Sequence, residues 1–305
     1  MLNVFLNGVM PVFGLLATGF LVGKWKVFDA ATAVAINRFV VLIAVPLLSF
    51  RLLARAPFHD FDWSLLAAFL IAELMVYGAG FTIARYFFRC GIAESVLLGM
   101  ASAFANHLLF ILPIAILLFG EEASLPIVAI ASVDAVVVYG GTVLALDALG
   151  QQGASVSRLL HQFSKNPAII GIFLGFIVGL IAIPLPRSVD AFTAFAGLTA
   201  APCALFALGI ILSQQAPPGG HGLSAAISVL KLLLLPLLAW AATAWAFDID
   251  PEWAKPAMMV AAGPSGAMAF VLALQYRVPV TAIARTVLYT SVGSLATVTA
   301  FAALM

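Results

Sequence analysis

A short apolar segment, SAFANHLLFILPIAILLFG (residues 102–120), carries side chains that can bind small polar molecules. Asn106 offers an amide, His107 an imidazole and Ser102 a hydroxyl, and Pro113 follows shortly after them. Proline lacks a backbone N–H and clashes with the carbonyl one turn earlier, so a helix opens around it. The half-helix that starts at such a break presents free N–H groups and a positive dipole end, which suit an anion. We therefore predict that this segment is a helix broken at Pro113, with an anion site at the break.

A second apolar segment, AAGPSGAMAF (residues 261–270), has a comparable break at Pro264, followed by Ser265. Two such breaks, facing each other near the middle of a membrane, would place Asn106 and Ser265 around one site that holds no permanent cation. A site of this kind can bind a carboxylate and still release it. In the alternative interpretation, Asn106 only caps its broken helix, and the hydroxyls of Ser102 and Ser265 bond to their own helices.

Two carboxylates lie in the middle of other apolar segments, Glu73 and Asp134. Intramembrane acids are costly, and each of these is a candidate carrier of a coupling proton. The alternative is a protonated acid, or an acid with a satisfied hydrogen bond at a domain interface. Asp134 is the stronger candidate, and the structural interpretation is favoured for Glu73. His107 can titrate near neutral pH or simply pack against a neighbouring helix. Lys231, inside another apolar segment, could attract an anion that enters from the cytoplasm, but the favoured expectation is that it extends to the headgroups. The same is expected of Arg285.

The composition identifies the class of protein. Of the 305 residues, 64% are hydrophobic and only 9% are charged, with a mean hydropathy of +1.16. A soluble chain needs about 25% charged residues to cover its surface, so this is an integral membrane protein. A net charge of +1 without a basic run excludes a nucleic-acid-binding surface. Cys90 and Cys203 are far apart in apolar segments and are expected to be packing residues. The N-terminus lacks the positive region of a cleaved signal peptide, so the first apolar segment is expected to remain as a span.

Ten segments have the roughly 20 apolar residues that a membrane span needs. They are residues 3–23, 31–53, 62–84, 92–119, 125–147, 166–185, 189–212, 223–247, 253–275 and 280–303. The joints between them are short, so no soluble domain is expected. The joints that follow odd-numbered spans hold Lys24, Lys26, Arg85, Arg89, Arg158, Lys165, Arg277 and, just inside the tenth span, Arg285. The other joints hold only Arg51, Arg55, Arg187 and Lys255. The excess of basic residues predicts that the first set is cytoplasmic and that both termini lie outside.

Prolines punctuate the two halves of the chain at similar intervals. Pro11 precedes Pro46 by the same number of residues by which Pro167 precedes Pro202, and Pro113 and Pro264 follow at comparable distances. Five spans per half invert the second half relative to the first, and inverted repeats with interrupted helices are typical of secondary transporters. The predicted organisation is an N-terminal five-helix repeat (1–150), a cytoplasmic connector (151–165) and an inverted C-terminal repeat (166–305).

Five stretches in this order resemble the auxin efflux carrier family, which includes bacterial malonate and malate carriers. They are ANHLLFILPIAILLFGEEA, AVVVYGGTVLALD, FSKNPAIIGIFLGFIVGL, APCALFALGIIL and GPSGAMAFVLALQY. The resemblance covers essentially the whole chain. It departs from the family pattern at Ile111, where a glycine is frequent, and at His107, where a small residue or threonine is usual. Both departures change the available space and the polarity beside the break.

The resemblance implies an all-α membrane protein of ten spans, built as a five-plus-five inverted repeat with broken helices four and nine that cross. This fold is shared with bile-acid sodium symporters, and its members move organic anions by an elevator-like motion. By position, Asn106 and Pro113 match the family's residues beside the substrate carboxylate, and Pro264 matches the break in the ninth span. Carriers of this kind commonly pair as dimers through a scaffold domain.

The predicted function is therefore secondary transport of a small organic anion, such as the dicarboxylate malonate, across a bacterial inner membrane, without a cofactor or bound metal. A cation/proton antiporter would need an acid at the breaks, and neither 102–113 nor 260–270 contains one. No cluster of carboxylates and carbonyl-bearing residues near the breaks marks the sodium site of a sodium-coupled symporter. Coupling to protons, or no coupling ion, is therefore favoured. An intramembrane enzyme is disfavoured because the histidines are scattered and no serine nucleophile with a base is recognisable. A receptor without transport would leave the repeats unexplained.

Overall fold

The computed structural model describes residues 10–55, 62–149, 167–213 and 221–304, together with positions 157, 161, 164 and 165. In these ranges the chain is helical, with no extended strand and a single isolated β-bridge. The all-α prediction is therefore confirmed for the described residues. The predicted connector (151–165) and the start of the first span (3–9) lie almost entirely outside them.

The α-helices are α2 (Met10–Lys24), α3 (Ala30–Phe39), α4 (Val45–Ala54), α5 (Trp63–Thr82), α6 (Ile92–Ala103), α7 (Leu112–Phe119), α8 (Ser124–Asp134), α9 (Gly140–Leu149), α11 (Pro167–Ile181), α12 (Arg187–Gly197), α13 (Ala200–Ser213), α14 (His221–Val229), α15 (Leu235–Ala241), α16 (Pro251–Ala262), α17 (Met268–Gln275) and α18 (Thr281–Leu304). Wider π-helical turns continue several of them: η2 (Val40–Ala44), η4 (Ile83–Phe87), η5 (His107–Ile111), η7 (Ala135–Tyr139), η8 (Leu230–Leu234) and η9 (Ala242–Ala246). A 3-10 turn, η6 (Glu121–Ala123), precedes α8.

Six continuous helices of the described chain are long and apolar enough to cross a membrane: Ala30–Ala54, Trp63–Phe87, Glu121–Leu149, Arg187–Ser213, His221–Ala246 and Thr281–Leu304. They coincide with predicted spans two, three, five, seven, eight and ten. The first and sixth predicted spans correspond to the shorter helices α2 and α11, and the fourth and ninth are each divided into two pieces. The chain is thus a multi-pass membrane protein, and the count of ten spans stays a prediction.

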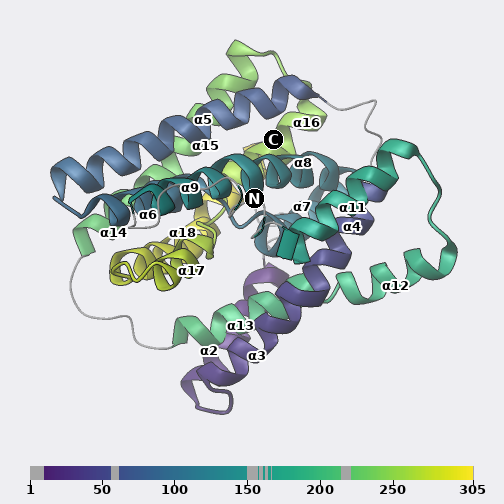
Figure 1. Ribbon diagram of the computed structural model, residues 1–305, viewed down its shortest axis with the longest axis horizontal. Coiled ribbons are helices and arrows are strands. Elements are labelled where there is room, and N and C mark those ends of the chain that lie inside the picture. The colour runs from purple at the N-terminus through teal and green to yellow at the C-terminus, as the bar shows by residue number, and fades with distance from the viewer. Residues whose placement is uncertain are drawn as a thin grey trace.

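The helices form two groups (Figure 1). In one, α2 packs along α13, and α4 packs along α11 and α12. These pairs approach closely because glycines face neighbouring backbone: a Cβ on Gly209 would overlap the carbonyl of Leu16, and one on Gly171 the carbonyl of Pro46. The other group contains α5, α6, α8, α14, α15, α16 and α18. The candidate site lies in this second group.

Large apolar side chains cover the outside of the helices, among them Phe87 and Phe195, which are 80% and 83% exposed. Such a surface is what a bilayer requires. The joints between the helices contribute acidic residues that cap helix N-termini. Asp62 accepts hydrogen bonds from the first N–H groups of α5, and Asp250 does so for α16. Asp29 caps α3 in the same way, and the hydrogen bonds from Thr32 hold the pKa of its carboxyl below the usual value.

Candidate functional site

The fourth predicted span is broken, but not at Pro113. Helix α6 ends at Ala103, the backbone is non-helical from Phe104 to Asn106, and η5 then starts at His107. Pro113 lies in the first turn of α7, directly after η5. The prediction of a break at Pro113 is therefore wrong by about two helical turns.

The reason is that a π-helical turn accommodates this proline without opening the helix. Within η5, hydrogen bonds reach one residue further back, as from the N–H of Ile111 to the carbonyl of Asn106 (3.2 Å). The missing N–H of Pro113 and the crowding of its ring are absorbed there. The same arrangement occurs where η2 precedes Pro46 and where η8 precedes Pro236.

The ninth predicted span breaks where expected. Helix α16 ends at Ala262, Pro264 lies in the non-helical stretch that follows, and α17 starts at Met268. The prediction for Pro264 is confirmed as to position.

The two non-helical stretches cross as a short antiparallel pair. Ala105 and Ser265 form an isolated β-bridge. The N–H of Asn106 donates to the carbonyl of Pro264 (3.0 Å), and the N–H of Gly266 donates to the carbonyl of Phe104 (2.9 Å). Backbone polar groups freed at both breaks thus satisfy each other inside the protein, as a membrane interior demands. We call residues 104–106 and 264–266 the crossing.

The crossing needs a glycine at position 266. A Cβ there would lie 2.9 Å from the carbonyl oxygen of Ala105 and 2.7 Å from the ring of Phe104. We expect Gly266→Ala to force the two stretches apart at a cost of about 1–3 kcal/mol, measured as a lower Tm of the purified protein. Gly78→Ala is the matched control, because a Cβ on this helical glycine meets nothing within 4 Å. Equal Tm values for the two variants would contradict the prediction.

The side chain of Asn106 is half-buried and makes no hydrogen bond to the helix that follows it. The alternative in which this amide only caps the broken helix therefore has no support from the geometry. The hydroxyl of Ser265 is buried and also has no hydrogen-bond partner in the described chain, while its N–H donates to Oγ1 of Thr290 (3.1 Å). Unlike the hydroxyl of Ser265, that of Ser102 donates to the carbonyls of Gly99 and Val76 (2.7 and 3.1 Å). The bond to Gly99 is the bond to its own helix that the structural alternative predicts.

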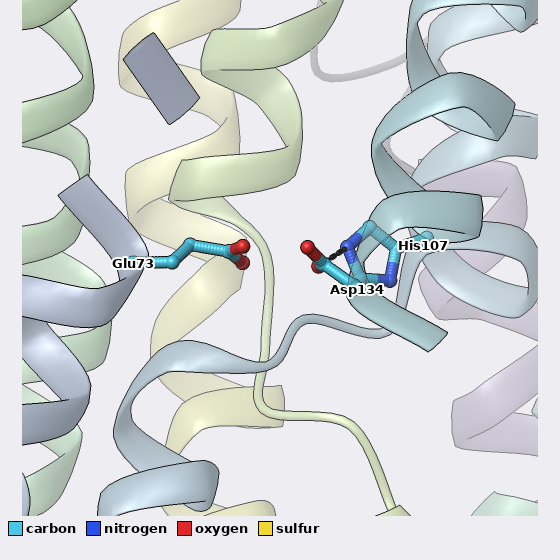
Figure 2. Close-up of side chains that lie close together, drawn as sticks. All are labelled: Glu73, His107 and Asp134. Carbon is cyan, nitrogen blue, oxygen red and sulfur yellow. Dashed lines mark ion pairs between the residues drawn. The ribbon is translucent and has the colours of Figure 1, made fainter. Parts of the chain in front are cut away.

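Three buried titratable side chains converge beside the crossing (Figure 2). Nε2 of His107 lies 2.8 Å from Oδ2 of Asp134, and both side chains are almost fully buried. Glu73 on α5 points its carboxyl toward this pair from the opposite side. Both oxygens of Glu73 are buried and have no hydrogen-bond partner among the described residues. The structure places Glu73 in one group with Asp134 and His107, and the structural interpretation favoured for Glu73, a protonated acid or a satisfied hydrogen bond, stays a prediction.

Lys231 was expected at the headgroups, and this is wrong. It is 0% exposed in η8, and its Nζ donates to the carbonyl of Ala261 at the end of α16 (3.1 Å). Ala261 lies three residues before Pro264, and the expectation that the site between the two breaks holds no permanent cation stays a prediction. Arg285 on α18, for which the same exposed position was expected, is only 2% exposed. A single sequence does not reveal this burial, because Lys231 becomes interior only through the packing of η8 against α5, α6 and α16.

Glu73, His107 and Asp134 are also ligand types that metals use, and one potential ligand atom from each lies within 4.8 Å of the others. The sequence predicts no metal site, because the histidines are scattered along the chain, and only the fold gathers this trio. The positive charge of Lys231 acts on both carboxyls. This charge opposes a divalent ion at the same place and suits a proton or a single positive charge better.

Comparisons with known proteins agree on one class. A family model described as "Membrane transport protein" matches residues 4–302. A Rhizobium meliloti (strain 1021) protein named "Putative malonate transporter" is 28% identical over 303 residues, which are 95% of this chain and 92% of that protein. Auxin efflux carrier components 7 and 3 of Arabidopsis thaliana are 29% and 30% identical over 176 residues. These matches cover 55% of this chain and only 27% and 26% of the plant proteins.

Proposed function

Because this chain belongs to the membrane transport protein family of auxin efflux carriers, we propose that it is a secondary transporter of small organic anions in a bacterial inner membrane. Malonate is the proposed substrate. This choice is supported by the relative named as a malonate transporter, which aligns with nearly the whole chain. A short dicarboxylate also suits the neutral donors at the crossing, which could bind one carboxylate.

One observation carries the proposal: the amide of Asn106 lies at the crossing, half-buried, with no hydrogen bond to its own helix. A polar side chain at membrane depth is costly unless it serves a partner. Asn106 immediately precedes the first turn of η5, whose N–H groups lack partners within the helix. Amide and backbone donors are thus available for one carboxylate. The orphan hydroxyl of Ser265, on the opposite stretch, is the proposed second contact.

In the proposed cycle, the crossing binds the anion and moves with its group of helices past the group that contains α2, α4, α11 and α13, as an elevator. Pro264 lies in the second non-helical stretch of the crossing, and Pro113 lies in the first turn of α7. Asp134 and Glu73 carry the coupling proton, and His107 connects them to Asn106, its neighbour in the chain. The proposed frame is two inverted repeats, 1–150 and 166–305, joined by the connector 151–165. Both termini are outside, and two copies of the chain form a homodimer.

The test is uptake of radiolabelled malonate into proteoliposomes that contain the purified protein, with a proton gradient and a sodium gradient imposed separately. Saturable uptake driven by the proton gradient is expected. Uptake that follows only the sodium gradient would favour a sodium-coupled symporter and contradict the coupling proposed here. Absence of uptake under every gradient would exclude malonate, and other dicarboxylates would then be compared in the same assay.

A further inference from the structure

Lys231 is a buried cation whose charge the proposed cycle does not use. Its ammonium group carries three donors, and one of them is assigned, to the carbonyl of Ala261 (3.1 Å). The side chain belongs to η8, which packs against α5, α6 and α16, and none of it is exposed. A lysine held this deep needs negative charge around it, because burying an unpaired ammonium is very costly.

That negative charge comes from two sources. The first is the C-terminal end of α16, whose last carbonyls carry the negative end of the helix dipole. Ala261 accepts from Lys231, and the next carbonyl, that of Ala262, accepts from Oγ1 of Thr297 (2.8 Å). The second is the pair of carboxyls on Glu73 and Asp134, on which the charge of Lys231 acts.

Backbone carbonyl and carboxylate oxygens around one point are the ligands that a hard alkali cation uses. Here a side chain of the protein supplies the charge instead. We propose that the ammonium of Lys231 is a tethered cation that fills the position of an alkali ion beside the crossing, so that the protein binds no sodium there. This inference rests on the proposed function. It adds to that function the group that takes the place of a coupling metal cation.

The proposal predicts that removing the tether creates a cation site. In Lys231→Ala, the carbonyl of Ala261 and the carboxyls of Glu73 and Asp134 remain, and the missing side chain leaves room for a small ion. We expect the Tm of this variant to be below that of the wild type in choline chloride. Sodium or lithium chloride at the same ionic strength should raise it by about 3 °C or more, in a concentration-dependent way. Wild-type Tm should be equal in all these salts, to within about 1 °C.

Two control variants separate a cation site from a general effect of salt. Lys231→Met keeps most of the volume but no charge, so its Tm should not depend on the cation. Lys255→Ala removes a partly exposed lysine near the start of α16 and should behave as the wild type does. None of these Tm measurements uses malonate or another substrate. Failure of malonate as the substrate and failure of this inference are therefore distinguishable.

A sodium-dependent Tm in the wild type would overturn the inference, because the site would then not be filled by Lys231. A folded Lys231→Ala that responds to no alkali cation would overturn it as well. If Lys231→Ala does not fold, Lys231→Ser tests the same vacancy. If both variants fail to fold even when sodium is present throughout purification, sodium cannot replace the ammonium, and the inference is also overturned.

Discussion

Asn106→Ala is expected to weaken malonate binding and the apparent affinity of transport by about 10- to 100-fold, the range for loss of a hydrogen bond to a charged group. The folded protein should tolerate the change, because this amide makes no hydrogen bond to its own helix that would be lost. Its Tm should stay within about 1 °C of the wild type. Initial rates of proteoliposome uptake over a range of malonate concentrations, with a thermal melt of the same preparation, measure both quantities.

Asn37→Ala is the matched control. Asn37 is another half-buried asparagine, in the last turn of α3 and not part of the crossing, so uptake should be unchanged. Equal effects of the two substitutions on uptake, or a large fall in the Tm of Asn106→Ala without loss of malonate affinity, would show that Asn106 has a structural role. The proposed binding site would then be wrong.

Glu73→Gln is expected to abolish proton-driven accumulation while leaving exchange of malonate across the membrane intact. The wild type should accumulate malonate about tenfold per unit of pH gradient for each coupled proton. Glutamine imitates the protonated carboxyl but cannot release the proton, so the variant should only equilibrate malonate. The charge of Lys231 acts on this carboxyl, so removing its negative charge is expected to lower the Tm, and a thermal melt shows that the variant is still folded at the assay temperature. Accumulation and counterflow exchange are measured in the same proteoliposomes.

Glu94→Gln provides the comparison. Glu94 lies in the first turn of α6, is partly exposed and is not part of the group around His107. This variant should accumulate malonate as the wild type does. If Glu73→Gln also accumulates malonate fully, Glu73 does not carry the coupling proton. If it loses exchange together with accumulation, Glu73 acts in binding or folding and not in coupling alone.

The membrane class, the family and most of the helical spans could be predicted from the sequence, because hydropathy and span length depend on local composition. Spans that are single long helices, such as Trp63–Phe87 and Thr281–Leu304, were predicted within a few residues. Asn106 and Pro264 were also recognised as members of the two broken segments, since polar residues and prolines are conspicuous in apolar surroundings.

The position of the first break could not be predicted in this way. Pro113 is the obvious candidate, yet the helix stops at Ala103, where no proline is present. The chain leaves the helix there because Phe104 and Asn106 exchange hydrogen bonds with Gly266 and Pro264, which are remote in sequence. A break that is stabilised by hydrogen bonds to a remote segment leaves no signal in the local sequence.

The buried charges were individually visible in the sequence but not as a group. Glu73, His107, Asp134 and Lys231 come from four different segments, and only the packing of those segments brings them together. Lys231 was interpreted as a headgroup contact because a lysine inside an apolar span commonly extends to the interface. The carbonyl of Ala261 and the two nearby carboxyls make the interior position tolerable, and all three lie far from it in the sequence.

The central claim is that the substrate binds at the crossing, and chemical protection of an introduced cysteine tests it most directly. Ala267 follows the crossing by one residue and is exposed. The test protein carries Ala267→Cys together with Cys90→Ser and Cys203→Ser, which remove both native cysteines. A reference protein carries Val27→Cys instead, at a 65% exposed position between α2 and α3.

We predict that malonate slows the reaction of the test protein's single thiol with a small water-soluble maleimide, in a saturable way. The thiol of the reference protein should react at the same rate with and without malonate. Saturable malonate uptake by the test protein, without any protection of its thiol, would contradict the claim.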